Sequence, residues 1–489
     1  MKRKITLVYP EVTGVIAPEI YGHFSEHIGG VIYDGIWVGK NSTVPNINGY
    51  RKELIEKLKA INPPVLRWPG GCFAETYNWR DGIGKNRPIR PQWWTTIDGR
   101  YESNEFGTHE FFELCELIGA KAYLAVNVTS VTPMEIRDWL DYCLSARGST
   151  TLAKLREENG RAEPFKIDYI GVGNENWGGG GNMTPEYYAL EFRRFSTVID
   201  NVTRGKIPLI LGGANGEDYA WTRGIVGTAE QVSAQISGMS FHYYTWKIGD
   251  ATNYTDGEWY AMLDYAARME TLIDRHYAVG VNYGIADKLP LVIDEWGCWH
   301  PDGSGPSEGY NLFEQQSTMR DAMVAALTLN IFNNNASKIC MANVAQLCNN
   351  LHSLFLSGGD KCITTPTYHV FNMYKEHQGA ECLRVLTEKS DRFSVSASRK
   401  NGKILITAAN YSLYDALELD IDVLGASVAA DAIVTTLSAS DVRLHNTFDC
   451  PDRLVPKSSA CGIENIVIPA AGIAAIELAL TQDENNTAK

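Results

Sequence analysis

Long apolar runs are missing from this chain of 489 residues, since none approaches the roughly 18 residues that cross a bilayer. The first twenty residues, MKRKITLVYPEVTGVIAPEI, start with basic residues but contain neither the apolar core nor the small-residue cleavage pattern of a signal peptide. Paired cysteines are missing too, because the ten cysteines lie singly and never form C-x-x-C. We therefore expect a soluble, cytoplasmic protein without a membrane partner, whose thiols are mostly reduced.

Positive charge is also scarce. The chain carries 44 Lys and Arg against 58 Asp and Glu, a formal net charge of −14. Such a balance repels polyphosphates, so we expect no nucleic-acid partner. Apolar residues make up 44% of the chain, which indicates a folded protein with a large core, and the length leaves room for a barrel of about 250 residues and a second domain.

Eight short apolar runs alternate with segments long enough to form helices, and each run ends in polar or glycine-rich residues. Near-continuous apolar strands alternating with helices predict a parallel sheet, and eight such units predict an α/β fold with a closed (β/α)8 TIM barrel. Thr184 and Pro185 have the residue types of a helix cap and first turn. The eight runs cover 20–30, 63–71, 121–128, 168–175, 207–215, 236–245, 289–297 and 337–346.

After about residue 380 the pattern changes to alternating strands and turns. Asn401 and Gly402 lie between two such strands and predict a tight hairpin. We expect a catalytic barrel over 17–379 and a β-sandwich over 380–483, with strand 1–16 joining the sandwich and a frayed tail over 484–489.

Two glutamates occupy the chemically important ends of the predicted strands. Glu175 follows the fourth strand and Glu295 lies at the end of the seventh, where TIM barrels place their reactive groups. Two such carboxylates predict glycoside hydrolysis, with the carboxyl groups about 5–5.5 Å apart in a retaining enzyme. From this pattern alone, strand-end carboxylates that pair with the next loop stay an alternative.

Four motifs extend the argument along the barrel, in the order RWPGGCFAETYNWRDGIG, GVGNENWGGGGNM, IDEWGCW and MANVAQL. Together they resemble the α-L-arabinofuranosidases of glycoside hydrolase family 51. The resemblance implies a retaining, exo-acting enzyme with Glu175 as acid/base and Glu295 as nucleophile. It also implies a jelly-roll-like C-terminal sandwich, a hexamer, and substrates that are oligo- or polysaccharides with non-reducing terminal α-L-arabinofuranosyl groups.

The same resemblance implies roles for seven more residues. Arg67 would keep Glu295 ionised, Asn174 would bind the sugar 2-hydroxyl, and Glu26 would accept hydrogen bonds from other arabinose hydroxyls. Tyr244 would contact the nucleophile, while Gln346, Trp299 and the more weakly matched Trp94 would close the furanose pocket. For Trp94, Trp177 and Trp246, ordinary core packing stays an alternative.

Cys72 departs from the family pattern, because many members have Asn at this position and a branch shares the Cys. A thiol is a weak hydrogen-bonding group, so the substrate contact at Cys72 is altered. A disulfide between Cys72 and Cys298 is a further possibility. The four glycines 178–181 are interpreted as a loop that passes close beside the substrate.

The segment His23 to His27, HFSEH, matches a zinc-protease signature. That chemistry needs both histidines on one helical face, and this segment has a strand-then-turn context. We expect no metal and no cofactor. A β-xylosidase or endoglucanase on the same barrel and a non-catalytic carbohydrate-binding protein are the alternatives, and the natural substrate stays open among arabinoxylan, arabinan and short oligosaccharides.

Overall fold

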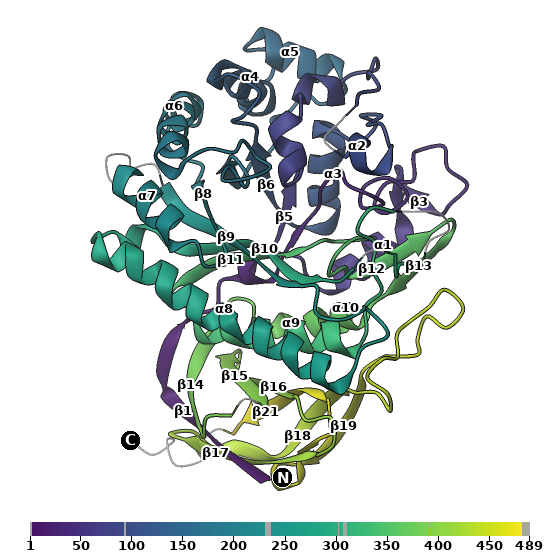
Figure 1. Ribbon diagram of the computed structural model, residues 1–489, viewed down its shortest axis with the longest axis vertical. Helices are drawn as coiled ribbons and strands as arrows, with labels where there is room; N and C mark the ends of the chain where they lie inside the picture. The colour runs from purple at the N-terminus through teal and green to yellow at the C-terminus, as the bar shows by residue number, and fades with distance from the viewer. Residues whose placement is uncertain are drawn as a thin grey trace.

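The computed structural model describes residues 2–91, 94–229, 236–301, 303–306, 311–390 and 392–481, and the predicted tail 484–489 lies outside them. Eight parallel strands close into a barrel in the order β10-β11-β2-β5-β6-β7-β8-β9, seen in the upper half of Figure 1. Every predicted barrel strand is confirmed. The strands are β2 (Gly22–Phe24), β5 (Val65–Trp68), β6 (Lys121–Val126), β7 (Tyr169–Val172), β8 (Leu209–Asn215), β9 (Ile236–Trp246), β10 (Leu291–Trp299) and β11 (Ile339–Ala345).

Helices surround these strands, which explains why the strands are apolar on both faces. The predicted cap is confirmed, because the Thr184 hydroxyl accepts a hydrogen bond of 3.3 Å from the Tyr187 N–H at the start of α6. The helices are α1 (Lys52–Ala60), α2 (Thr95–Asp98), α3 (Thr108–Ile118), α4 (Pro133–Leu144), α5 (Thr151–Glu158), α6 (Pro185–Thr203), α7 (Tyr219–Ala229), α8 (Asp256–Asn282), α9 (Met319–Asn334) and α10 (Pro366–Tyr374). Short hairpins β3 (Asn46–Ile47) with β4 (Tyr50–Arg51), and β12 (Phe355–Gly358) with β13 (Lys361–Thr364), lie in connecting segments.

The remaining strands form a nine-stranded sheet in the order β19-β18-β21-β16-β15-β14-β1-β17-β20. Its buried apolar side chains form one cluster, so the sheet curls over a core of its own. Asn401 and Gly402 both have positive φ, 52° and 75°, in the predicted hairpin. The strands are β1 (Lys2–Val15), β14 (Glu381–Thr387), β15 (Phe393–Lys400), β16 (Lys403–Asn410), β17 (Leu417–Leu424), β18 (Val428–Leu437), β19 (Lys457–Gly462), β20 (Val467–Ile468) and β21 (Ile473–Leu480).

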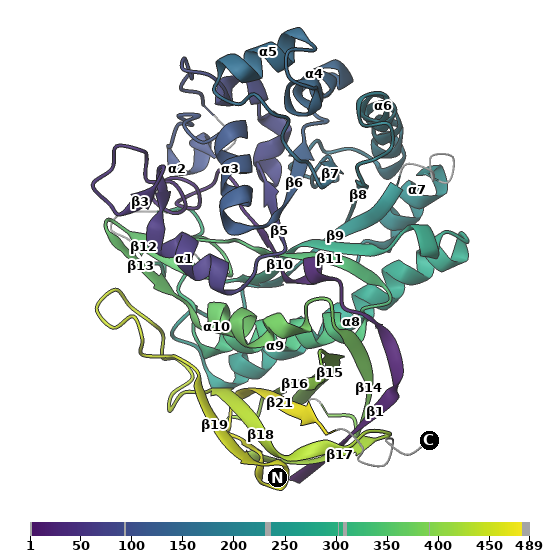
Figure 2. The same ribbon diagram turned by 180° about the vertical axis from the view of Figure 1, so that it is seen from behind.

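The N-terminal strand β1 lies inside this sheet, antiparallel to β14 and parallel to β17. Helices α8, α9 and α10 lie between the barrel strands and the sheet in both views (Figures 1 and 2). The α9 contact is polar: Asn330 donates to the Ser394 hydroxyl at 2.9 Å, and Asn333 donates to the Ser396 hydroxyl at 3.1 Å. Because these groups are paired and mostly buried, they hold the barrel and the sheet in a defined orientation.

Candidate active site

A small pocket of about 60 Å³ opens at the carboxyl ends of the barrel strands. Eight of the ten residues predicted for the site line it, and the other two lie behind it, where Arg67 donates to Glu295 and Asn174 contacts Cys72. The predicted residues that line the pocket are Glu26, Cys72, Trp94, Glu175, Tyr244, Glu295, Trp299 and Gln346. Strand ends from across the sequence therefore meet at one site, as the barrel requires.

Glu295 lies on β10 and accepts hydrogen bonds on both carboxylate oxygens. Arg67 Nη1 donates to Oε1 at 2.9 Å, and the Tyr244 hydroxyl donates to Oε2 at 2.8 Å. Burial raises the pKa of Glu295, the charge of Glu175 raises it further, and the charges of His242 and Arg67 oppose that rise. The two donors fix the orientation of this carboxylate in the pocket.

Glu175 lies just beyond β7 in a sharp turn, with φ of 87° at Gly173 and 44° at Glu175 itself. Its Oε1 lies 2.8 Å from His242 Nδ1, and its Oε2 lies 3.5 Å from Cys72 Sγ. One oxygen of Glu175, one oxygen of Glu295 and a ring nitrogen of His242 all lie within 4.8 Å of one another. The turn thus brings Glu175 beside Glu295 instead of leaving it in solvent.

Arg67 links the residues around the two glutamates. It is fully buried on β5, donates to Glu295 and to the Asn174 side-chain oxygen, and lies 3.6 Å from Asp294. A register shift between Val292 and Glu295 lets the neighbours Asp294 and Glu295 both approach this guanidinium. Its planar fork presents donors to several oxygens in fixed directions, whereas the rotating ammonium of a lysine would not fix them.

Glu26 and Gln346 form a reciprocal pair at the pocket wall. The Glu26 N–H donates to Gln346 Oε1 at 2.9 Å, and Gln346 Nε2 donates back to Glu26 Oε2 at 3.1 Å. The Phe73 N–H donates to Glu26 Oε1 at 2.9 Å. Burial, reinforced by the charge of Glu295, raises the pKa of Glu26 to about 7.

Aromatic rings form the opposite wall. Trp299 packs edge-on against Tyr244 and Phe313, with ring centroids 5.2 and 4.8 Å away, and Trp246 lies 4.4 Å from it. Trp94 packs against Phe313 at 6.1 Å, and both rings line the pocket. Phe313 lies in the loop after β10 and was not predicted, because that loop has no periodic pattern.

His242 is the main residue that sequence analysis missed. Its Nδ1 faces Glu175 and Glu295, and its Nε2 lies 3.1 Å from an Asp294 oxygen. Burial lowers the pKa of His242, but Glu295, Asp294 and Glu175 together raise it to about 10. Strand alternation could have indicated it, since residues two apart share a face and His242 precedes Tyr244 by two on β9.

Glu75 was also missed, although it lies in the GGCFAET motif. Its Oε2 accepts from the Val128 and Thr129 N–H groups at 2.8 and 2.9 Å, and its Oε1 accepts from the Asn174 N–H at 2.7 Å. Asn176 donates to the same Oε1 at 3.1 Å. The carboxylate therefore holds the loops after β6 and β7 together, including the segment that carries Glu175.

The interpretation of the glycine run needs correction. A Cβ atom at Gly180 would lie 1.6 Å from the Asn174 carbonyl oxygen, and Gly180 N–H donates to the Glu175 carbonyl at 3.1 Å. The close approach is therefore to the backbone of the Asn174–Glu175 turn, and none of the four glycines lines the pocket. Gly180 supports the turn from behind.

The possible Cys72–Cys298 disulfide is wrong, since both thiols are free. Cys72 faces the pocket, whereas the Cys298 side chain points away from it. The Cys298 Sγ lies within 4.8 Å of a carboxylate oxygen of Asp321 on α9 and of a ring nitrogen of His352.

The HFSEH segment is not a helix: His23 lies on β2, while His27 contacts Glu102 at 2.9 Å and Trp68 at 3.0 Å. The two histidines thus have different surroundings.

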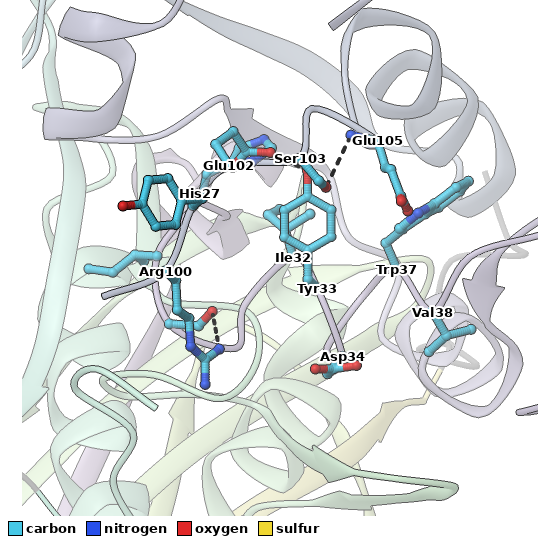
Figure 3. Close-up of a pocket in the computed structure, with 13 residues that line it drawn as sticks. His27, Ile32, Tyr33, Asp34, Trp37, Val38, Arg100, Glu102, Ser103 and Glu105 are labelled. Atoms are coloured by element: carbon cyan, nitrogen blue, oxygen red, sulfur yellow. Dashed lines mark hydrogen bonds and ion pairs between the residues drawn. The ribbon is translucent and has the colours of Figure 1, made fainter. Parts of the chain in front are cut away.

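A second, larger hollow of about 470 Å³ lies beside the pocket, and Ile28 lines both. Figure 3 shows the residues around this hollow, with Tyr33, Asp34 and Trp37 from the loop after β2 and Arg100 and Glu102 from the loop after β5. The indole N–H of Trp37 is buried without a hydrogen-bond partner. Aromatic faces with nearby carboxylates suit a sugar ring, since they cover C–H groups and accept from hydroxyls.

A closed (β/α)8 barrel with two adjacent carboxylates at its mouth is typical of glycoside hydrolases. Comparisons with known proteins show which family of glycoside hydrolases the chain resembles. Residues 57–261 match the family model described as α-L-arabinofuranosidase 1 domain, and 294–469 match the α-L-arabinofuranosidase C-terminal domain. An "Intracellular exo-alpha-L-arabinofuranosidase" of Bacteroides ovatus is 39% identical, with 95% of this chain and 93% of that protein covered.

Solved structures similar to this chain include further arabinofuranosidases. The GH51 arabinofuranosidase of Xanthomonas axonopodis pv. citri has a TM-score of 0.91 at 37% identity, covering 98% of this chain and 99% of that one. The α-L-arabinofuranosidase of Thermotoga maritima, solved as an arabinose complex, has a TM-score of 0.83 at 28% identity, with 98% and 100% covered. The chain belongs to the α-L-arabinofuranosidases of glycoside hydrolase family 51. Among the described residues, no helix combines the length and apolar character that crossing a membrane requires.

Proposed function

We propose that the protein is a retaining, exo-acting hydrolase that releases non-reducing terminal α-L-arabinofuranosyl groups from oligo- or polysaccharides. The observation that carries this proposal is the approach of Glu175 and Glu295, whose nearest ligand oxygens lie within 4.8 Å of each other and of His242. An inverting enzyme needs about 6.5–9.5 Å between its carboxyl groups to admit a water molecule, whereas a retaining enzyme needs about 5–5.5 Å. The arrangement favours retention.

In this mechanism Glu295 attacks the anomeric carbon and forms a glycosyl-enzyme ester, while Glu175 protonates the departing glycosidic oxygen. Glu175 then takes a proton from water, which attacks the ester and releases arabinose and the free Glu295 carboxylate. Arg67 and Tyr244 support the attack, because their hydrogen bonds point the carboxylate of Glu295 into the pocket.

Recognition of the furanose ring is assigned to the polar wall and the aromatic wall. Glu26, held by Gln346, would accept hydrogen bonds from sugar hydroxyls, and Asn174 would bind the 2-hydroxyl. Trp299 would cover the C–H face of the ring. The pocket volume of about 60 Å³ is far below that of clefts that hold drug-sized ligands, about 300–1,000 Å³. A space of this size admits at most one terminal sugar, which supports exo action.

The glycan that carries the arabinose needs a second place to bind. The hollow beside the pocket would receive it, because Ile28 lines both and the hollow offers Trp37, Asp34 and Tyr33. Trp37→Phe keeps one aromatic ring but removes the unpaired N–H together with the second ring of the indole. We expect it to lower kcat/KM for arabino-oligosaccharides several-fold while leaving an aryl arabinofuranoside unaffected. Equal changes on both substrates would contradict this role.

Two further parts of the proposal rest on similarity. The name of the Bacteroides ovatus relative supports action inside the cell, on imported oligosaccharides. The family resemblance supports a hexamer, which size-exclusion chromatography with light scattering would test. A monomer in solution would contradict that part and leave the chemistry untouched.

The decisive experiment is hydrolysis of 4-nitrophenyl α-L-arabinofuranoside beside the β-D-xylopyranoside and β-D-glucopyranoside, with EDTA present. We expect a clear preference for the arabinofuranoside. Glu295→Ala should abolish turnover, and azide should restore Glu175→Ala because this anion needs no general base to attack the glycosyl-enzyme, releasing the arabinosyl azide and the free Glu295 carboxylate. Preference for the xyloside, or near-normal turnover by Glu295→Ala, would refute the assignment.

A further inference from the structure

Three atoms in the pocket are spaced like the ligands of a metal ion. Glu175 Oε1 lies 2.8 Å from His242 Nδ1, Glu295 Oε2 lies 3.4 Å from the same nitrogen, and the three residues' ligand atoms lie within 4.8 Å of one another. Tetrahedral zinc, with bonds of about 2.0–2.2 Å to nitrogen and oxygen, places its ligand atoms about 3.3 Å apart. Small side-chain shifts would therefore bring all three into contact with one ion.

The ring of His242 is already oriented as in zinc proteins. Its Nε2 lies 3.1 Å from Asp294 Oδ1, and Asp294 is in turn held by Tyr123 at 2.9 Å. Metal-binding histidines commonly donate their second N–H to a carboxylate, which fixes the tautomer and presents the other nitrogen to the metal. Asp294 thus fixes the ring so that Nδ1 faces the two glutamates, and an ion bound there would replace the Nδ1 proton.

A thiol lies next to this set of ligands. Cys72 Sγ lies 3.5 Å from the second oxygen of Glu175, and it lines the pocket with both glutamates. Imidazole and carboxylate donors together suit zinc, whereas magnesium and calcium prefer oxygen alone. The pocket gives an ion an entry path to Glu175 and Glu295, which line it.

We propose that Glu175, His242 and Glu295 bind one Zn²⁺ ion in the place of the substrate. Catalysis needs no metal in the mechanism above, so the ion acts as a competitive inhibitor. The binding site follows from the geometry alone, and only its inhibitory effect rests on the proposed function.

Equilibrium dialysis of the full chain against buffered Zn²⁺, with a competing chelator, tests the site. We expect one tight site per chain, with affinity at least about tenfold weaker in His242→Ala and about 10–100-fold weaker in Asp294→Asn, because outer-shell partners contribute that much. Cys450→Ser removes an exposed thiol far from these residues in sequence and serves as the matched control. Zinc binding to His242→Ala as tight as to the wild type would overturn the proposal.

Wild-type measurements keep the test independent of whether the variants fold. Arabinose at saturating concentration should weaken zinc binding in the dialysis, and zinc should raise KM for 4-nitrophenyl α-L-arabinofuranoside without lowering kcat, reversibly with EDTA. Zinc binding unaffected by arabinose would place the ion elsewhere and refute the site. If no arabinofuranoside were hydrolysed, the proposed function would fail, while the effects of His242→Ala and Asp294→Asn on zinc affinity would still decide the metal site.

Discussion

Removal of one hydroxyl, in Tyr244→Phe, should shift the acid limb of the pH profile of kcat/KM to higher pH. The Tyr244 hydroxyl donates to Glu295 Oε2 at 2.8 Å, and burial raises the pKa of Tyr244 well above its usual value, so this hydroxyl stays a donor throughout the working range. The hydrogen bond favours the ionised form of Glu295. Without it, Glu295 becomes protonated at higher pH and the nucleophile is lost sooner on acidification.

The size of the shift follows from the strength of that bond. A hydrogen bond to a charged group contributes about 1.5–3 kcal/mol, and about 1.4 kcal/mol corresponds to one pH unit. The acid limb should therefore move up by about one to two units. Arg67 and His242 still face Glu295 in the variant, so the shift is expected toward the lower end of this range.

The assay is kcat/KM for 4-nitrophenyl α-L-arabinofuranoside across pH, because this ratio reports the ionisation of the free enzyme. Tyr243→Phe is the matched control, since the adjacent Tyr243 hydroxyl donates to the Tyr265 carbonyl at 2.6 Å, away from the pocket. The control should keep the wild-type profile. An unchanged or downward-shifted limb in Tyr244→Phe would refute the role of this hydroxyl.

Two other changes test the support behind the catalytic turn. Gly180→Ala should lower both activity and melting temperature, because its methyl group would collide with the Asn174 carbonyl and overpacking costs about 1–3 kcal/mol. Gly178→Ala is the control: its methyl group would meet no atom within 4 Å, so this variant should behave as wild type. Burial outweighs the hydrogen bonds of Glu75 and raises its pKa to about 7, so its contribution to stability is present below about pH 4.5 and declines as pH rises towards 7. The side chain introduced by Glu75→Gln cannot titrate, so the free energy of unfolding of this variant minus that of the wild type should rise by about 3 kcal/mol between pH 4.5 and 7. Calorimetry that shows the same difference between variant and wild type at both pH values would contradict the raised pKa of Glu75.

The barrel could be predicted from sequence because each of its strands has a pattern within its own few residues. Each strand is a short apolar run, and closure into a barrel places every strand's carboxyl end at one mouth, so residues such as Glu26, Glu175 and Gln346 must meet there. The family motifs then identified most of the pocket. The N-terminal strand β1 was expected to join the sheet, and it pairs with β14 and β17.

What sequence analysis missed depends on side-chain direction and on loops. Packing between distant segments turns the Cys298 side chain towards α9 instead of towards Cys72. Such packing also places Gly180 against the turn that it supports. His242 and Glu75 act through neighbours brought close only by the fold, and Phe313 lies in a loop without periodicity. No local pattern marks these positions.

The place of β1 in the sheet has a consequence for synthesis on the ribosome. Ile5 pairs with Thr387, so the first strand must wait for about 380 further residues before its antiparallel partner exists. At about 5–20 residues per second that delay lasts roughly 20–80 seconds, during which the whole barrel emerges and can fold. The unpaired strand, with Ile5 and Leu7 destined for the core, is a natural binding site for a chaperone in that interval.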